Sequence, residues 1–240
     1  MTLADILASL FGDAHDVTLA GDSLAGRGTL PDGGAVHVLG FANRAELGVD
    51  QAIGLAARVL DIAKTADRAP ILFLIDSSSQ RMSRRDELLG LNEYLAHLAK
   101  ALAFAEQAGH RSVGLLYGGS AAGAFIATAL ACSALVALPG ADPAVMDLPS
   151  MARVTKLPIE VLQQKARTTP VFAPGLQNLV LVGAVAEVWD PAQPLSGQLT
   201  ALLARPADGD RRGALGKARG GRAKASDIAD TVVASATAHG

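Results

Sequence analysis

Short apolar runs alternate with amphipathic stretches along most of this chain, which is the pattern of a layered α/β protein. Three runs, residues 71–75, 113–117 and 133–138, are apolar almost throughout. Strands of this kind are expected to be buried on both faces of a parallel sheet. Between them, residues 86–107 carry leucines at helical intervals, and residues 120–130 are small and apolar enough for a buried helix. The pattern predicts three parallel neighbouring strands with a helix between each pair.

The flanking stretches predict further helices and a hairpin. Residues 2–11 and 47–64 have the spacing of amphipathic helices, and the Pro-Asp-Gly-Gly turn at residues 31–34 joins two short strands. After residue 138 we expect a loop with three prolines at 139–151, a helix at 158–166, a strand at 179–189 and helices at 194–204 and 227–236.

The composition changes near the C-terminal end. Residues 205–224 hold five arginines, two lysines and five glycines, with no aromatic residue. The sequence therefore predicts one domain over residues 1–204, then a basic flexible segment and a weak C-terminal helix over residues 205–240. A charge run of this kind is most often a solvated loop. The functional alternative is docking of an acidic carrier protein or of a phosphate.

Composition and charge narrow the function classes. Half of the residues are apolar but only 4% are aromatic, so the core must consist mainly of Ala, Leu and Val. The net charge of −2 gives no indication of nucleic-acid or membrane binding. A single cysteine, Cys132, excludes an internal disulfide and a multi-cysteine metal site. With no signal peptide or membrane span in the pattern, we expect a soluble, cytoplasmic protein.

Two polar or glycine-rich segments follow neighbouring predicted strands, and we expect them to form one cleft. One is the loop Asp76-Ser77-Ser78-Ser79-Gln80, and the other is the Gly118-Gly119 turn before a helix. Backbone N–H groups at such a helix start suit a developing negative charge. The expected site residues are Gly118, Gly119 and Ser120 as catalytic amides, Ser78 and Ser79 as a candidate second amide loop, and Ser77, Gln80, Ala121, Ala122 and Gly123 as substrate-binding residues. The alternatives are a close packing joint at the glycines and simple strand capping at the loop.

Other catalytic motifs are incomplete. The dinucleotide fingerprint lacks a glycine where Ser120 stands, and no P-loop is present. A nucleophile elbow is nearly formed at residues 118–122, but its triad order requires a histidine after Ser120, and only His239 qualifies. We expect His37, His97 and His110 to be structural or solvated, because none has a partner at metal or triad spacing. No metal site is expected.

Two strings carry a resemblance to a known superfamily. P-I-L-F-L-I-D-S-S-S-Q and V-G-L-L-Y-G-G-S-A-A-G-A resemble the crotonase and biotin-carboxyltransferase superfamily, in which the first strand commonly ends D-x-P-G and a G-G-S or G-G-G turn opens the next helix. Ser78-Ser79 stand where carboxyltransferases tend to have Pro-Gly. Residues 40–189 as a whole are similar to the gamma subunits of biotin-independent malonate decarboxylases. Two further strings carry this closer match, S-S-S-Q-R-M-S-R-R-D-E and L-V-G-A-V-A-E-V-W.

The resemblance implies a crotonase-like ββα spiral fold with a mostly parallel sheet and flanking helices. It also implies pairing with a homologous beta subunit, and a malonyl thioester carried on the phosphopantetheine-type arm of an acyl-carrier protein. Decarboxylation would leave an acetyl enolate held by backbone amides, with no biotin and no directly bound cofactor. The alternatives are another crotonase-fold acyl-thioester enzyme, a serine hydrolase using Ser120, and a non-enzymatic scaffold subunit.

Overall fold

A computed structural model describes residues 1–206 and 209–238 of the chain. The chain forms two compact units, which are described separately. Unit 1 consists of Met1–Val145 and Val188–Ala207, and unit 2 of Met146–Glu187 and Asp208–Gly240. Among the helices of the described residues, none is both long and apolar enough to cross a membrane.

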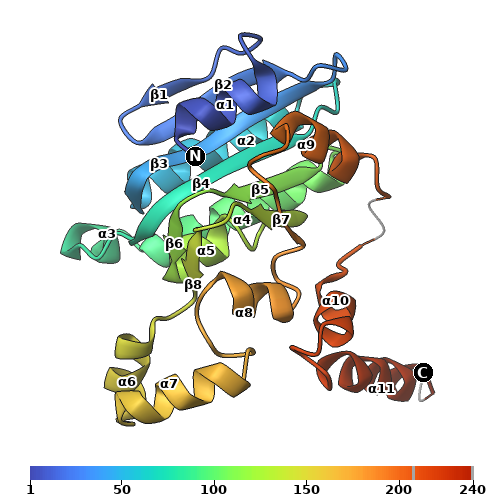
Figure 1. The fold of residues 1–240 in the computed structure, drawn as a ribbon. Coiled ribbons are helices and arrows are strands. Elements are labelled where there is room, and N and C mark those ends of the chain that lie inside the picture. The colour runs from blue at the N-terminus through green and yellow to red at the C-terminus, as the bar shows by residue number, and fades with distance from the viewer. Residues whose placement is uncertain (207–208, 239–240) are drawn as a thin grey trace. The chain divides into compact units, whose positions relative to one another are not determined.

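The main sheet has seven strands in the order β1-β2-β3-β4-β5-β7-β9 (Figure 1). Their bounds are Thr18–Ala20 (β1), Ser23–Thr29 (β2), Ala35–Leu47 (β3), Ile71–Gln80 (β4), Ser112–Leu116 (β5), Ala134–Ala137 (β7) and Glu187–Val188 (β9). β1, β2 and β3 are antiparallel, and β3, β4, β5 and β7 are parallel. A small second sheet pairs β6, Gly119–Ala121, with β8, Asp142–Ala144. The predicted hairpin and the three predicted parallel neighbours are confirmed.

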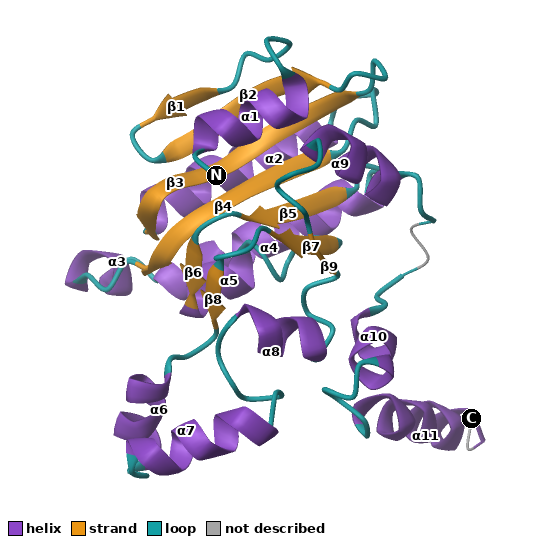
Figure 2. Cartoon of the chain, viewed as in Figure 1, coloured by secondary structure: helices purple, strands orange, loops and turns teal. Residues whose placement is uncertain are grey.

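Helices cover both faces of the main sheet (Figure 2). Those of unit 1 are Leu3–Phe11 (α1), Val49–Ala63 (α2), Arg84–Leu88 (α3), Leu91–Gln107 (α4), Ala122–Ala127 (α5) and Leu195–Leu203 (α9). α1 packs against α9, and α2 packs against α4. Unit 2 contains Leu148–Thr155 (α6), Ile159–Thr168 (α7), Leu176–Leu181 (α8), Arg212–Ala218 (α10) and Ala225–Ala238 (α11).

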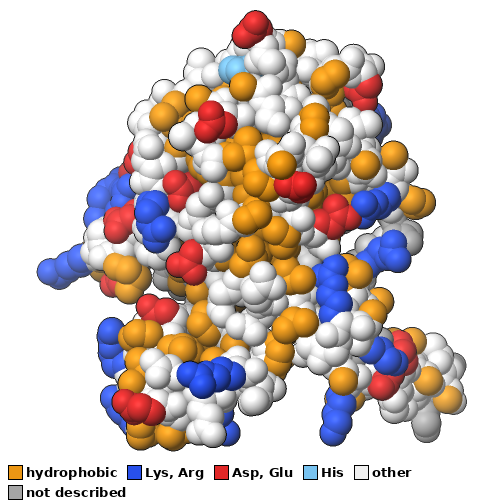
Figure 3. Space-filling model, in the orientation of Figure 1, with side chains coloured by type: hydrophobic (Ala, Val, Ile, Leu, Met, Phe, Trp, Pro, Cys, Tyr) orange, Lys and Arg blue, Asp and Glu red, His pale blue; other side chains and the backbone are white. Residues whose placement is uncertain are grey.

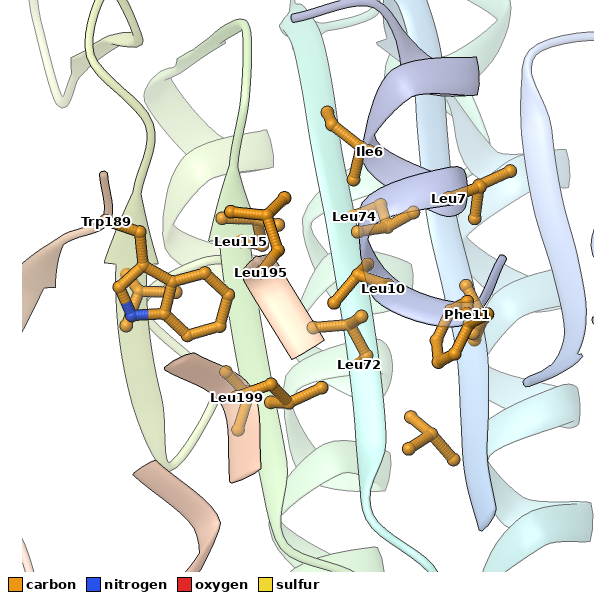
Figure 4. Packing of buried hydrophobic residues seen from close by; sticks show 14 of the residues in the cluster. Ile6, Leu7, Leu10, Phe11, Leu72, Leu74, Leu115, Trp189, Leu195 and Leu199 are labelled. Carbon is orange, nitrogen blue, oxygen red and sulfur yellow. The ribbon is translucent and has the colours of Figure 1, made fainter. Parts of the chain in front are cut away.

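The main core lies between the sheet and the pair α1 and α9. Leu72 and Leu74 of β4 point into it, beside Leu115 and the fully buried Trp189 (Figure 4). The residues of β4 that point to the opposite face are also buried. Among them, the ring of Phe73 lies edge to face with the ring of Phe41, with 5.7 Å between the ring centroids. Burial on both faces is the physical reason why β4 reads as a continuous apolar run.

One close backbone approach is built into the centre of this sheet. Gly40 of β3 has φ +149°, and a Cβ placed there would overlap the carbonyl oxygen of Leu74 on the neighbouring β4. Only glycine has both the backbone freedom and the absence of a side chain that this position requires.

Three predicted elements around the candidate site differ in the structure. Residues 76–80, expected as a loop, continue β4, because they pair with the distal half of β3 after a register shift. The helix expected over residues 120–130 is instead the strand β6 followed by the shorter α5. The helix expected over residues 86–107 is broken between α3 and α4 at Gly90, whose φ is +81°.

The other differences lie between residues 139 and 189. The strand expected over residues 179–189 is mostly the end of α8 and a loop, with only β9 at its end, because the chain turns at Gly183 with φ +82°. The loop expected at residues 139–151 contains β8 and the start of α6.

The stretch expected to be a flexible basic segment contains α10. The guanidinium of Arg219, next to its C-terminus, donates to the carbonyls of Val180 and Val185 at 2.8 Å and of Ala186 at 2.7 Å. Arg212 pairs with Asp210, and Lys217 pairs with Asp227. Much of the basic charge in this stretch is therefore engaged within unit 2.

Candidate active site

The carboxylate of Asp76, within β4, joins the backbone of β3 at Arg44 to the glycine turn that follows β5. Its Oδ1 accepts the backbone N–H of Gly119 at 3.0 Å, and its Oδ2 accepts the N–H of Arg44 at 3.1 Å. A Cβ on Gly118 would overlap this carboxylate, so the approach requires glycine. Asp76, a residue that the sequence places in a polar loop, thus determines the shape of the glycine turn.

The hydroxyl of Ser120 is buried and bonded to a second serine. Its Oγ lies 3.0 Å from the Oγ of Ser77, and each residue is only 1% exposed. A nucleophilic serine would need a histidine at this position instead. His239, the triad histidine that the sequence offered, lies outside the described residues.

The segment after Ser120 carries an unusual backbone conformation. Ala122, the first residue of α5, has φ +52°, which is strained for a residue with a Cβ. The next N–H, that of Gly123, donates to Oε1 of Gln80 at 2.7 Å. Two residues predicted to bind substrate therefore meet. Gln80 is partly exposed, so the acceptor of this N–H lies near the surface of unit 1.

Gln80 also lines a surface hollow of about 330 Å³, which is bordered by Arg81, Met82, Glu87, Gly90, Leu91 and Asn92. The hollow lies beside the start of α4. It borders the candidate site at Gln80, whose side chain accepts the N–H of Gly123.

Arg44 is a cation at this site that no pattern in the sequence indicates. Asn43 and Arg44 have φ of +60° and +52°, where the pairing of β3 with β4 shifts register. A Cβ on Gly119 would lie 2.9 Å from a guanidinium nitrogen of Arg44, so the exposed side chain reaches over the glycine turn. It places a positive charge beside the glycine turn.

Tyr117 supports the site rather than acting in it. Its hydroxyl donates to the carbonyl of Phe41 at 2.9 Å. Burial, followed by the negative charge of Asp76, raises the pKa of Tyr117, so the phenol stays protonated at neutral pH.

Ser78 and Ser79 belong to the paired end of β4 rather than to an amide loop. The hydroxyl of Ser79 donates to the carbonyl of Gln80, and the buried Oγ of Ser78 has no hydrogen-bond partner within residues 1–206 and 209–238. Their catalytic role stays a prediction, and so does that of the Gly118, Gly119 and Ser120 amides. The substrate-binding role of Ser77, Gln80, Ala121, Ala122 and Gly123 also stays a prediction.

The parallel sheet with helices on both faces and the glycine turn after β5 are those of a crotonase-like carboxyltransferase fold, as the matches to solved structures show. The core of transcarboxylase 12S has this fold, with a TM-score of 0.68 at 19% identity over 84% of this chain and 40% of that chain. The model of the malonate decarboxylase gamma subunit family matches residues 42–236. The chain belongs to that family.

Two relatives extend the comparison. A subunit of a Pseudomonas malonate decarboxylase heterotetramer in complex with coenzyme A is 28% identical, has a TM-score of 0.74, and matches over 98% of this chain and 97% of its own. The malonyl-S-ACP:biotin-protein carboxyltransferase MADD of Malonomonas rubra is 31% identical over 176 residues, which are 66% of this chain. The matched region spans only 59% of that relative's length.

Proposed function

We propose that this chain is the gamma subunit of a malonate decarboxylase that acts together with a homologous beta subunit. The reaction converts a malonyl thioester on an acyl-carrier protein to the acetyl thioester. The observation that carries the proposal is the end-to-end similarity to a chain of the Pseudomonas decarboxylase, which holds coenzyme A. Coenzyme A and the carrier protein present their thioesters on the same kind of phosphopantetheine arm.

The chemistry needs hydrogen-bond donors more than it needs an acid or base. When the C–C bond to the carboxylate breaks, CO₂ leaves. The electron pair of that bond moves onto the thioester carbonyl and gives an enolate oxygen. A proton added at the carbon then gives the acetyl group. Preorganised amides are suited to hold the enolate oxygen. The Gly119 amide is engaged by Asp76, so the Gly123 amide, shared with Gln80, is the more accessible donor.

The surface of unit 2 supports assembly with a partner. Ile228, Val232 and Val233 lie on one side of α11 and are each more than 60% exposed. Apolar side chains also reach the surface on α6 and α7 (Figure 3), where Val154 is 68% exposed. Exposed apolar patches of this kind mark protein interfaces, which is consistent with a subunit of a heteromer.

A second function, carboxyl transfer to a biotin protein, is favoured by the relative from Malonomonas rubra, whose name states that activity. Both reactions remove the same carboxyl group and leave the same enolate. They differ in whether the carboxyl group is released as CO₂ or accepted by biotin.

We expect the isolated chain to release no CO₂ from malonyl-CoA or from a malonyl-loaded carrier protein, and the complex with its beta subunit to release it. Within residues 1–206 and 209–238, the candidate site of one chain offers amides and a cation but no complete catalytic set. Isotope-labelled CO₂ and acetyl thioester are measured for each chain alone and for the pair. Full turnover by this chain alone would overturn the subunit proposal. Labelled carboxybiotin, formed only when a biotin protein is added, would favour the second function.

Replacing Arg44 by glutamine is expected to raise the KM of the complex for the malonyl thioester about fivefold, because an exposed ion pair contributes about 1 kcal/mol. The kcat should change little, since Arg44 contacts a bound anion, the malonyl carboxylate or the phosphate of the arm, rather than the enolate. Arg58→Gln, at an exposed position of α2, is the matched control. An unchanged KM at low salt would remove Arg44 from the site.

A further inference from the structure

Three side chains able to bind a metal ion lie at the edge of the sheet opposite to the candidate active site. His37 of β3 is paired with Ile71, the first residue of β4, and His110 comes just before β5. Asp67 lies in the connection that leads from α2 into β4. The parallel arrangement brings together residues that are far apart in the sequence. The two histidines, which the sequence presents as isolated, are therefore neighbours.

The ligand atoms of the three residues are close together. One ring nitrogen from each histidine and one carboxylate oxygen all lie within 4.8 Å of one another. The Nε2 of His37 is 3.4 Å from the carboxylate of Asp67, and the two imidazole rings are 6.0 Å apart, edge to face. Zinc ligands lie about 2.0–2.2 Å from the ion, so the three ligand atoms must move closer together to complete the site.

The strongest indication is an orphan nitrogen on a fully buried ring. His110 is 0% exposed, and its Nδ1 lies 2.8 Å from the carbonyl oxygen of Ala69. Because a carbonyl only accepts, Nδ1 carries the proton and the neutral ring has its lone pair on Nε2. That Nε2 has no hydrogen-bond partner among the residues that the structure describes. A histidine whose other nitrogen donates to a backbone carbonyl is the usual form of a metal ligand.

The carboxylate is held in place in a comparable way. The Oδ1 of Asp67 accepts the N–H of Ala69 at 3.1 Å and the hydroxyl of Thr65 at 3.0 Å. Its Oδ2 accepts a guanidinium N–H of Arg27 at 2.7 Å. Such outer contacts orient a ligand for the ion.

We propose that His37, Asp67 and His110 bind a Zn²⁺ ion, with the fourth position open to water beside the exposed Asp67. Two imidazole nitrogens and one carboxylate suit zinc and related transition metals, whereas Mg²⁺ and Ca²⁺ take oxygen ligands. The ion would join the starts of β3 and β5 to the entry of β4. Its role is to stabilise the sheet, away from the reacting thioester.

The test uses the untagged full chain, stripped with a chelator and then equilibrated with Zn²⁺. Metal content is measured by mass spectrometry, affinity by competition with a chromophoric chelator, and stability by thermal unfolding with and without zinc. His110→Asn keeps a donor toward the Ala69 carbonyl but removes Nε2, and His37→Gln keeps a polar group toward Asp67. Asp67→Asn is a third variant, at an exposed position. His97→Gln, on the exposed side of α4, is the matched control.

We expect one Zn²⁺ per chain with micromolar or tighter affinity, and a rise in the midpoint of thermal unfolding when zinc is added. His110→Asn and Asp67→Asn should each lower the affinity at least about tenfold, while His97→Gln should bind zinc as the unmodified chain does. Co²⁺ in place of Zn²⁺ should give the visible absorption of a four-coordinate site. Failure of the folded chain to retain zinc, or equal binding by His110→Asn and Asp67→Asn, would leave only the ion-pair network and overturn the proposal.

Discussion

Replacing Gly118 by alanine is expected to lower the kcat of the complex about 10²-fold or more, which is comparable to losing an oxyanion donor. The added Cβ would overlap the carboxylate of Asp76, which must then move. Its bonds to the amides of Gly119 and Arg44 would break, and the glycine turn would lose its shape. Gly119→Pro should have a similar effect, because proline removes the N–H that Asp76 accepts. Steady-state decarboxylation by the complex measures both changes.

Ser120→Ala should be much milder and separates amide catalysis from serine catalysis. It removes one side of the hydrogen bond with Ser77 but keeps every backbone donor. We expect a loss of about 1–3 kcal/mol in stability and no more than about tenfold in kcat. A complete loss of turnover in Ser120→Ala, with an acyl group trapped on the unmodified Ser120, would instead indicate a serine hydrolase. The matched control for the methyl group that Gly118→Ala adds is Gly54→Ala, at an exposed and open position of α2.

Gly40→Ala is expected to prevent stable folding of unit 1. Its φ of +149° is unfavourable for alanine, and the new Cβ would overlap the Leu74 carbonyl in the central strand β4. A single substitution rarely lowers the free energy of unfolding by more than about 4 kcal/mol. We expect such a loss here because backbone strain and a backbone clash coincide within the core. Denaturant unfolding and expression yield measure the effect. Gly54→Ala should be neutral or stabilising by about 0.5–1 kcal/mol. A Gly40→Ala chain as stable as the unmodified one would show that β3 and β4 can separate.

The sequence predicts the central sheet well, because residues buried on both faces leave a local signal. The runs that became β4, β5 and β7 are apolar at nearly every position. Where pairing partners are distant, the signal disappears. Residues 76–80 read as a polar loop, yet they extend β4 because Ser77 pairs with Ala45 and Gln80 with Leu47. A stretch of small residues such as 119–127 fits a strand or a helix equally well, and tertiary packing divides it between β6 and α5.

The candidate site was predictable in part. The Gly118-Gly119 turn and the polar end of β4 do meet, through Asp76 and through the bond between Gly123 and Gln80. Arg44 could not be identified, because its position depends on a left-handed backbone within β3 that no motif marks. His37 and His110 could not be paired either, since only the parallel order of the strands brings them to one edge.

The burial of Trp189 has a practical consequence for studying the protein. It is the only tryptophan of the chain, it is 2% exposed, and it packs in the core beside Leu195 and Leu199 (Figure 4). Both tyrosines, Tyr94 and Tyr117, also belong to unit 1. Intrinsic emission therefore follows the melting of unit 1 alone, whereas far-ultraviolet dichroism also records the helices of unit 2. Comparing the two signals in one experiment resolves the order in which the units unfold, without any label.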